Sequence, residues 1–358
     1  MSDALAQISK AGVAVCLDDL SRDRLKSGSL AKLIKEDSVV GVTTNPIIFA
    51  SAISKSDLYR SDILQNKDKS IEEIITKITT DDVREACDLF SNTFKESNEI
   101  DGRVSLEVDP RFALDPAATI KQGKELWNIV DRRNLLIKVP GTIEGLPAVT
   151  ELIAQGISVN ITLIFSIDRY KKVLDAFASG LEMRVEKSQD ISNVHSVASF
   201  FISRIDVEVD TQLGNQPDLK GLAAIANAIM AYEAYLEFEK SDRWQKLLAH
   251  GGRLQRPLWA STGVKDPAYP DTQYVVELIA PETVNTMPQS TLDALIDHGV
   301  VRGNTISGNY ADAVNVFKGL SALGISLDHI TTELEIDGVK KFAQAWEELL
   351  ENVKAAQQ

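Results

Sequence analysis

Cysteine and histidine are scarce in this chain, which contains two cysteines and four histidines among its 358 residues. Two cysteines are too few for a disulfide framework or a cysteine-rich zinc site. Cys16 and Cys87 both lie in apolar segments, where a free cysteine packs as a small hydrophobic side chain. The histidines are scattered, without the spacing of a His-x-His pair or of a helical His-Glu-x-x-His motif: His195, His250, His298 and His329. The sequence therefore predicts no metal site.

The chain also lacks a long apolar run and an excess of positive charge. No stretch approaches the roughly 20 apolar residues that cross a bilayer as a helix. The start, Met1–Ala4, has neither the basic nor the apolar region of a secretory signal. The net charge is −14, whereas nucleic acids and anionic membranes bind to a basic face that displaces counterions. We therefore expect a cytoplasmic protein with no nucleic-acid or membrane partner.

Internal repeats, low-complexity tracts and long linkers rich in proline, glycine or serine are absent as well. Hydrophobic residues make up 44% of the chain and charged residues 25%, which is the balance of a globular protein with a large buried core. Because nothing in the sequence marks a domain boundary, we expect a single domain over residues 1–358.

Short apolar runs of strand length alternate with amphipathic segments. Eight runs fit strands: Gly12–Asp18, Val39–Thr44, Arg103–Val108, Leu135–Val139, Ile157–Thr162, Val194–Phe200, Pro257–Thr262 and Tyr274–Ala280. Eight strands separated by helices are the pattern of an α/β protein with a (β/α)₈ TIM barrel. The segment at about 47–99 is longer than one crossover and predicts extra helices. A C-terminal helix is expected at about 338–354, packed on the barrel.

Several predicted strands carry polar side chains on one face. At the two-residue period of a strand, Val104 and Leu106 lie opposite Glu107. A barrel strand buries both faces, so the apolar set suits the helix-facing side and the polar set the interior. The same alternation points five late strand residues inward: Asp18, Glu107, Lys138, Asn160 and Thr162. Barrels of this type hold their active sites at this end, so we expect the five to converge there, although each alone also fits an exposed strand end.

Lys138 places one ammonium in an otherwise apolar run, Leu135–Val139. Desolvation favours the neutral amine of a lysine, which is the form that attacks a ketone. The resulting iminium is an electron sink. The bond between the third and fourth carbons of a ketose can therefore break once a base has removed the C4 hydroxyl proton. We predict that Lys138 forms a Schiff base with a ketose phosphate.

The two inward carboxylates, Asp18 and Glu107, are the candidate acid/base groups, and different surroundings can give them different roles. We assign the C4 hydroxyl proton to Asp18. Glu107 is expected beside Lys138, where it would activate the water that forms and hydrolyses the imine, with Thr162 holding that water. Asn45 and Asn160 offer hydrogen bonds to the dihydroxyacetone hydroxyls without adding titrating groups.

Four ordered motifs resemble the signature segments of transaldolases: Gly41–Pro46 (GVTTNP), Arg103–Asp109 (RVSLEVD), Leu136–Thr142 (LIKVPGT) and Asn160–Ser166 (NITLIFS). Two further segments match, Leu17–Arg22 near the start and Leu258–Gly263 late in the chain. Four motifs in order are a specific signal, and together the segments extend the resemblance over most of the sequence.

The resemblance implies a class I aldolase-type barrel that needs no cofactor. Transaldolases of the pentose phosphate pathway move a dihydroxyacetone unit from sedoheptulose 7-phosphate to glyceraldehyde 3-phosphate, giving erythrose 4-phosphate and fructose 6-phosphate. The resemblance supports Lys138 as the Schiff-base lysine, with Asp18 and Glu107 as acid/base groups. Further site residues are implied as well: Asn45, Asn160, Thr162 and Ser199. Arg204 matches the family's phosphate-binding arginine, and a bidentate guanidinium suits a phosphate dianion.

One position departs from the better-known branch of the family, which is also shorter than this chain. That branch has a second phosphate-binding arginine two residues beyond the serine that Ser261 matches, and this chain has Gly263 there. Lys265 is the nearest cation and is the expected substitute. Backbone N–H groups near Gly263 are an alternative anion ligand, and Lys265 would then be a solvated loop charge.

Two other functions fit the same residues. A fructose 6-phosphate aldolase, or another class I aldolase, would release dihydroxyacetone instead of transferring it, and lysine chemistry alone does not separate the two. A non-catalytic barrel that binds sugar phosphates would use Lys138 and Glu107 only as ligand contacts. The sequence makes no prediction of oligomeric state.

Overall fold

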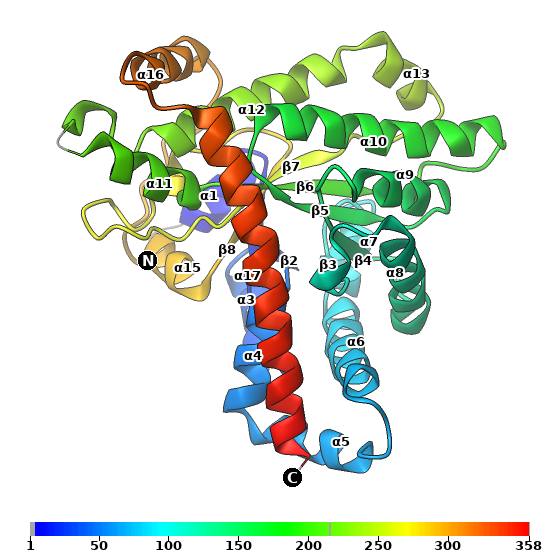
Figure 1. Cartoon of the computed structure of the whole chain (residues 1–358). Helices are drawn as coiled ribbons and strands as arrows, with labels where there is room; N and C mark the ends of the chain where they lie inside the picture. The colour runs from blue at the N-terminus through cyan, green and yellow to red at the C-terminus, as the bar shows by residue number, and fades with distance from the viewer. Residues whose placement is uncertain (1–3, 215, 358) are drawn as a thin grey trace.

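Eight parallel strands form a closed barrel in the computed structural model, which describes residues 4–214 and 216–357 (Figure 1). Each strand pairs with the next along the chain, and the last pairs with the first. The strands are β1 (Val13–Leu17), β2 (Val39–Val42), β3 (Arg103–Glu107), β4 (Leu135–Pro140), β5 (Val159–Ile164), β6 (Ser196–Phe201), β7 (Arg256–Ala260) and β8 (Thr283–Met287). The predicted (β/α)₈ barrel is confirmed.

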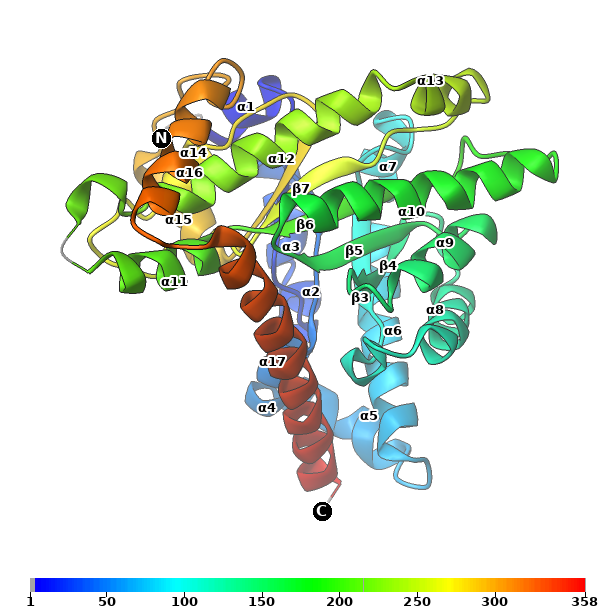
Figure 2. The ribbon, with the colours of Figure 1, turned by 45° about the horizontal axis from the view of Figure 1, so that its top comes forward.

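Helices surround this barrel. Those up to β5 are α1 (Ala4–Lys10), α2 (Arg22–Ser27), α3 (Ser29–Glu36), α4 (Pro46–Lys55), α5 (Arg60–Gln65), α6 (Ile71–Leu89), α7 (Ser91–Glu96), α8 (Pro116–Val130) and α9 (Leu146–Ala154). The later ones are α10 (Ile167–Glu186), α11 (Ser203–Leu213), α12 (Ala223–Glu239), α13 (Asp242–Ala249), α14 (Gln273–Val276), α15 (Gln289–His298), α16 (Tyr310–Ala322) and α17 (Leu327–Ala356). The segment at about 47–99 thus holds α4 to α7. Figure 2 shows α10 and α12 side by side, against β6 and β7.

Local sequence fixes where several of these helices begin. The Asp115 side chain accepts a hydrogen bond from the Ala118 N–H, and Pro116 occupies the first turn of α8, where its missing N–H costs nothing. Ser70 and Glu73 form a reciprocal capping box at the start of α6. Such caps satisfy the free N–H groups at the helix starts.

Strand register sets the polar side chains at one level inside the barrel. Glu107 on β3 is paired with Lys138 on β4, and Lys138 is paired with Asn160 on β5. In parallel strands, paired residues point to the same face of the sheet. The three side chains therefore form one row across neighbouring strands, as their alternation with apolar residues predicted.

The predicted eighth strand, Tyr274–Ala280, is wrong. This run begins in the short helix α14 and continues as a turn, while the strand that closes the barrel is Thr283–Met287. Tyr274 and Ile279 are buried. The run is therefore apolar because it forms a buried helix and turn, and not because it forms a strand. The true strand presents Thr286 to a polar interior, where its hydroxyl shares a hydrogen bond with Thr43. Its apolar content is correspondingly low. The other strands differ from prediction by a few residues at their ends.

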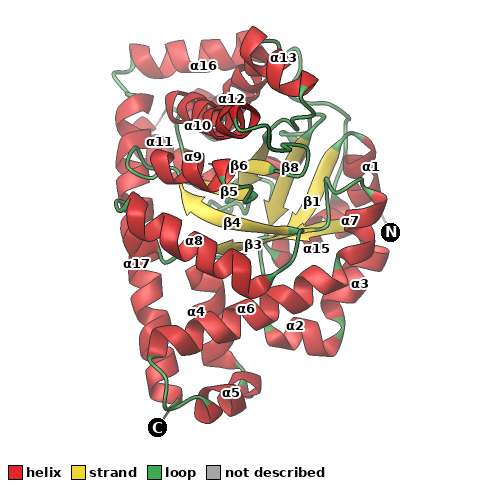
Figure 3. Cartoon of the chain, turned by 90° about the vertical axis from the view of Figure 1, so that its right-hand side faces the viewer, coloured by secondary structure: helices red, strands yellow, loops and turns green. Residues whose placement is uncertain are grey.

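Helix α17 crosses the end of the barrel toward which the strands point. In Figure 3, α17 lies on the side of the molecule toward which the β4 arrow points. The helix packs closely at Gly338, where an added Cβ would lie 3.1 Å from the Leu163 side chain. The ion pair of Arg169 with Glu335 connects the helix to α10. At Leu327–Ala356 it is longer than the helix expected at about 338–354.

No helix in the described part of the chain combines the length and hydropathy that a membrane crossing needs. Met1, Ser2 and Asp3, which contributed to the expected cytoplasmic location, lie outside the described residues.

Candidate active site

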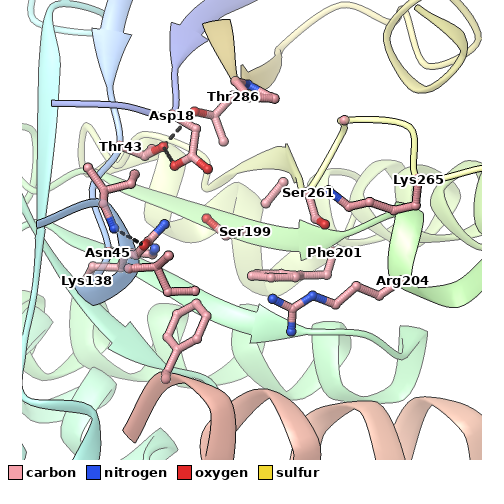
Figure 4. Close-up of a pocket in the computed structure, with 16 residues that line it drawn as sticks. Asp18, Thr43, Asn45, Lys138, Ser199, Phe201, Arg204, Ser261, Lys265 and Thr286 are labelled. Carbon is pink, nitrogen blue, oxygen red and sulfur yellow. Dashed lines mark hydrogen bonds between the residues drawn. The ribbon is translucent and has the colours of Figure 1, made fainter. Parts of the chain in front are cut away.

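A cavity of about 250 Å³ opens at the C-terminal ends of the strands, and most of the predicted site residues line it (Figure 4). These are Asp18, Asn45, Lys138, Ser199, Arg204, Ser261 and Lys265. The remaining three, Glu107, Asn160 and Thr162, are buried on β3 and β5. The barrel therefore brings residues far apart in the sequence to one end, as the active sites of such barrels require.

Lys138 is buried, and three contacts fix its ammonium. Nζ donates a hydrogen bond to the Thr44 carbonyl oxygen at 3.0 Å. It lies 3.2 Å from Glu107 Oε2 and 5.7 Å from the centre of the Phe342 ring. The contact with Phe342 comes from α17, so the helix across the barrel mouth also forms one wall of the cavity.

Glu107 has a raised pKa of about 7. Burial is the largest cause, because removal from water disfavours the carboxylate. The positive charge of Lys138 opposes this effect, and the nearby Asp18 adds to it. Apart from the contact with Lys138, the Glu107 oxygens and the Thr162 hydroxyl have no hydrogen-bond partner among the described residues. These groups are therefore free to bind a substrate atom or a water molecule.

A second, small cavity borders Glu107. Its volume is about 20 Å³, and its lining includes Gln122 and Trp346. That volume holds about one water molecule. The indole N–H of Trp346 is buried and has no partner within the described residues.

Asp18 follows β1 and is held by a threonine pair. The Thr43 hydroxyl lies 2.7 Å from Asp18 Oδ1 and 2.6 Å from the Thr286 hydroxyl. Burial raises the pKa of Asp18, against the opposing effect of the Lys138 charge. A carboxylate with a raised pKa is a stronger base than an exposed aspartate, and the threonine hydroxyls fix its direction.

Amide and hydroxyl side chains form the polar floor of the site. Asn160 donates to the Ser105 hydroxyl at 3.0 Å and accepts from the Ser199 hydroxyl at 2.7 Å. The Asn45 oxygen accepts from the Ile48 N–H at 3.0 Å and caps α4, which leaves the Asn45 NH₂ group for a ligand.

Cationic side chains lie at the other end of the cavity. Figure 4 shows Lys138 and Asp18 on one side, Arg204 and Lys265 on the other, and Ser199 and Phe201 between them. The Arg204 guanidinium stacks 5.2 Å from the Phe201 ring centre. Burial lowers the Arg204 pKa, but a guanidinium stays charged at neutral pH. Its Nη1 is buried without a partner among the described residues. The arginine is therefore available for an anion.

Lys265 lies beside the glycine that departs from the family pattern. Its Nζ is 3.8 Å from the position that a Cβ on Gly263 would take. Ser261 adopts a left-handed conformation, with φ of 57°, and its hydroxyl lies 3.0 Å from the Ser203 hydroxyl. The lysine ammonium thus reaches the region that a side chain at position 263 would occupy.

Among the lining residues that sequence reasoning missed are Thr43, Phe201, Thr286 and Phe342. Phe201 was detectable, because it follows Ser199 by two residues and so shares its face of β6. Thr43 stands inside a recognised motif but was given no role. Thr286 lies on the strand that was misplaced. Phe342 gave no signal, because nothing in an amphipathic helix tells which site its buried face will meet.

A family model described as Transaldolase/Fructose-6-phosphate aldolase matches residues 15–353. Curated relatives bear the name transaldolase, and three of them illustrate the similarity. That of Mycolicibacterium smegmatis is 54% identical over 97% of this chain and 95% of its own length. The proteins from Frankia alni and Mycobacterium tuberculosis are 53% and 52% identical, each over 98% of this chain and 96% of its own length.

The charge of Lys138 should control the protonation of Glu107. In Lys138→Met the opposing positive charge is lost while burial remains, so the Glu107 pKa should rise above its value of about 7. Infrared difference spectra over a pH series measure this as the C=O band of the protonated carboxyl. Glu107→Gln identifies the band by its absence. An unchanged or lower pKa in Lys138→Met would contradict the described balance of burial and charge.

Proposed function

The chain belongs to the transaldolase/fructose-6-phosphate aldolase family and has transaldolase function, and we propose that it works through a Schiff base on Lys138. The dihydroxyacetone unit of sedoheptulose 7-phosphate is transferred to glyceraldehyde 3-phosphate, giving erythrose 4-phosphate and fructose 6-phosphate. One observation carries the proposal. A buried lysine, 3.2 Å from a carboxyl group with a pKa of about 7, stands in a cavity whose far end is cationic.

The Lys138 ammonium gives a proton to Glu107, 3.2 Å away, and the resulting amine attacks the C2 carbonyl of the ketose phosphate. The carbinolamine loses water and becomes an iminium, which accepts the electron pair of the bond between the third and fourth carbons. Asp18 takes the C4 hydroxyl proton as that bond breaks, and the aldose phosphate leaves. An enamine of dihydroxyacetone remains on Lys138. It adds to the aldehyde of the acceptor, Asp18 returns the proton, and water releases the new ketose phosphate.

Glu107 exchanges protons with the water molecule of imine formation and hydrolysis. Its pKa of about 7 suits a group that both gives and takes protons near neutral pH. The Thr162 hydroxyl has no partner in the described part of the chain, which supports a role for it in holding that water. Glu107 and Lys138 are paired on neighbouring strands, which supports a role for Glu107 in forming and hydrolysing the imine. We assign the C4 hydroxyl proton to Asp18 instead.

Arg204 and Lys265 bind the phosphate of the substrate. Arg204 presents a buried Nη1 that has no partner among the described residues, and Lys265 reaches the region beside Gly263. Ser261 lines the same end of the cavity. The Asn45, Asn160 and Ser199 side chains, nearer Lys138, bind the hydroxyls of the dihydroxyacetone unit. We place the enzyme in the cytoplasm, with sugar phosphates as its substrates and no cofactor.

Lys138 should be the site of covalent attachment. Incubation with fructose 6-phosphate and borohydride should leave a reduced dihydroxyacetone adduct on the peptide that contains Lys138, as read by mass spectrometry. Lys138→Met should form no adduct and keep its fold, since an apolar chain of similar length suits the site. Lys265→Met, the matched loss of a cavity lysine, should keep the adduct. Attachment to another lysine would contradict the assignment.

The same reaction distinguishes transfer from aldol cleavage. With erythrose 4-phosphate as acceptor, fructose 6-phosphate should yield sedoheptulose 7-phosphate. A fructose 6-phosphate aldolase would instead release dihydroxyacetone at a comparable rate without an acceptor, and that result would overturn the proposed transfer.

Removal of each carboxyl group should block a different step. Asp18→Ala should still form the Schiff base but stall before cleavage, so borohydride should trap a six-carbon adduct. Glu107→Ala should slow formation of the imine and lower kcat by about 10²–10⁴, the usual share of one acid/base group. Mass spectrometry of quenched mixtures reads both results. Normal accumulation of the three-carbon adduct in Asp18→Ala would remove Asp18 from the cleavage step.

Loss of the two cations should affect binding of the phosphate to different degrees. Arg204→Ala should raise KM for sugar phosphates strongly, because a charge-assisted pair is lost, whereas Lys265→Ala should raise it more weakly. Steady-state kinetics with fructose 6-phosphate measures both. If Lys265→Ala has no effect while Arg204→Ala does, backbone amides near Gly263 are the second phosphate ligand.

A further inference from the structure

A larger cavity, of about 450 Å³, lies at the end of the barrel opposite to the candidate active site. Arg103 and Arg256, the first residues of β3 and β7, line it together with His195, which directly precedes β6. Because the strands are parallel, their first residues lie far from the strand ends that carry Lys138. Figure 3 shows the two ends, with α7 on one side of the barrel and α17 on the other.

Three arginines of this cavity converge on one turn after α7. Arg253 donates to the Asn98 carbonyl oxygen at 2.8 Å, and Arg103 donates to that of Glu99 at 2.5 Å. Arg103 and Arg256 both donate to the Ile100 carbonyl oxygen, each at 3.2 Å. The shared acceptor places the Arg103 and Arg256 guanidinium groups next to each other.

The positive charge of this cluster is only partly neutralised. Arg256 pairs with Asp101 at 2.8 Å. Arg103 and Arg253 form no ion pair with any carboxylate in residues 4–214 and 216–357. Arg103 is 7% exposed, and burial together with the charge of Arg256 lowers its pKa to about 9. Carbonyl dipoles satisfy some N–H groups, and Glu99 and Asp101 offset part of the Arg103 charge. A buried charge that is only partly compensated remains costly. An anion in the cavity would relieve that cost.

His195 adds a second, independent feature. The residue is 7% exposed, and its buried Nε2 has no hydrogen-bond partner among the described residues. Burial and the surrounding arginines lower its pKa to about 2, so the ring is neutral at neutral pH. A neutral imidazole with its proton on Nε2 donates one hydrogen bond without adding charge. The cavity therefore offers a neutral donor beside cationic ones.

We propose that this cavity is a binding site for a phosphate monoester, held by Arg103, Arg253 and Arg256 with His195 as a further donor. Guanidinium groups match the geometry and charge of a phosphate dianion. The same cavity is lined by Trp244 and Tyr235, which suit an organic body attached to the phosphate. Glu239 and Glu282 also line it and disfavour a second anionic group. A sugar phosphate and a nucleoside monophosphate share this chemistry.

Histidine NMR tests the site in a position-specific way. Protein labelled with ¹⁵N-histidine and carrying Arg204→Ala, which removes the phosphate-binding arginine of the active site, is titrated separately with inorganic phosphate, glucose 6-phosphate and adenosine 5′-monophosphate. The signal that His195→Gln deletes should shift and saturate with at least one monoester. The monoester that binds more tightly shows whether the site prefers a sugar phosphate or a nucleoside monophosphate. Binding should not depend on Lys138, so failure of the Schiff-base proposal leaves this result unaffected.

Two variants test the arginines. Arg253→Gln should weaken monoester binding at least tenfold, because a charge-assisted contact is lost. Arg132→Gln is the matched control. It removes one positive charge from an exposed arginine that pairs with Asp88 outside the cavity, and it should leave the affinity unchanged.

A variant at the rim of the cavity, Leu248→Glu, provides a second test in case Arg253→Gln does not fold. Leu248 lines the cavity and is 49% exposed, so Leu248→Glu adds a negative charge without removing a buried contact and should also weaken binding. The proposal is overturned if no monoester shifts the His195 signal, if inorganic phosphate alone does so, or if Arg253→Gln and Arg132→Gln have equal effects.

Discussion

Lys138 carries its amine into the barrel, where little water reaches it, and Glu107 lies 3.2 Å away on the neighbouring strand. In this low-polarity setting, neither charge is stable without the other. Burial raises the Glu107 pKa to about 7, and the contact with Lys138 keeps this pKa from rising further. The paired strands β3 and β4 set this balance, since their register places the two residues opposite each other. The fold thus fixes the protonation chemistry before any substrate binds.

The sequence predicted the barrel but not all of its parts. Seven strands were located because their apolar runs are buried on the helix-facing side. The eighth was misplaced because β8 contains Thr283, Asn285 and Thr286, so that three of its five residues are polar, while the nearby run from Tyr274 is apolar for another reason. Local hydropathy does not distinguish a strand from a helix and turn that pack on one.

Alternation along strands predicted only part of the site, because it points Lys138, Glu107 and three further polar residues to one interior. Ser199 and Arg204 were predicted from the family resemblance. Lys138 was recognised as a lone ammonium in an apolar run, and Glu107 by its position on the opposite face from Val104 and Leu106. The parts that no local pattern revealed come from tertiary packing. Phe342 contacts the lysine only because α17 crosses the barrel mouth. The alternation in Arg103–Glu107 likewise does not show that Arg103 at its start would meet two other arginines.

The place of α17 in the chain has a consequence for biosynthesis. A ribosome makes all eight strands before it makes this helix, and a domain generally folds as a unit. The walls that α17 supplies, Phe342 beside Lys138 and Trp346 beside the small cavity at Glu107, are therefore made after all eight strands. The enclosure around Lys138 is therefore complete only once α17 has been translated.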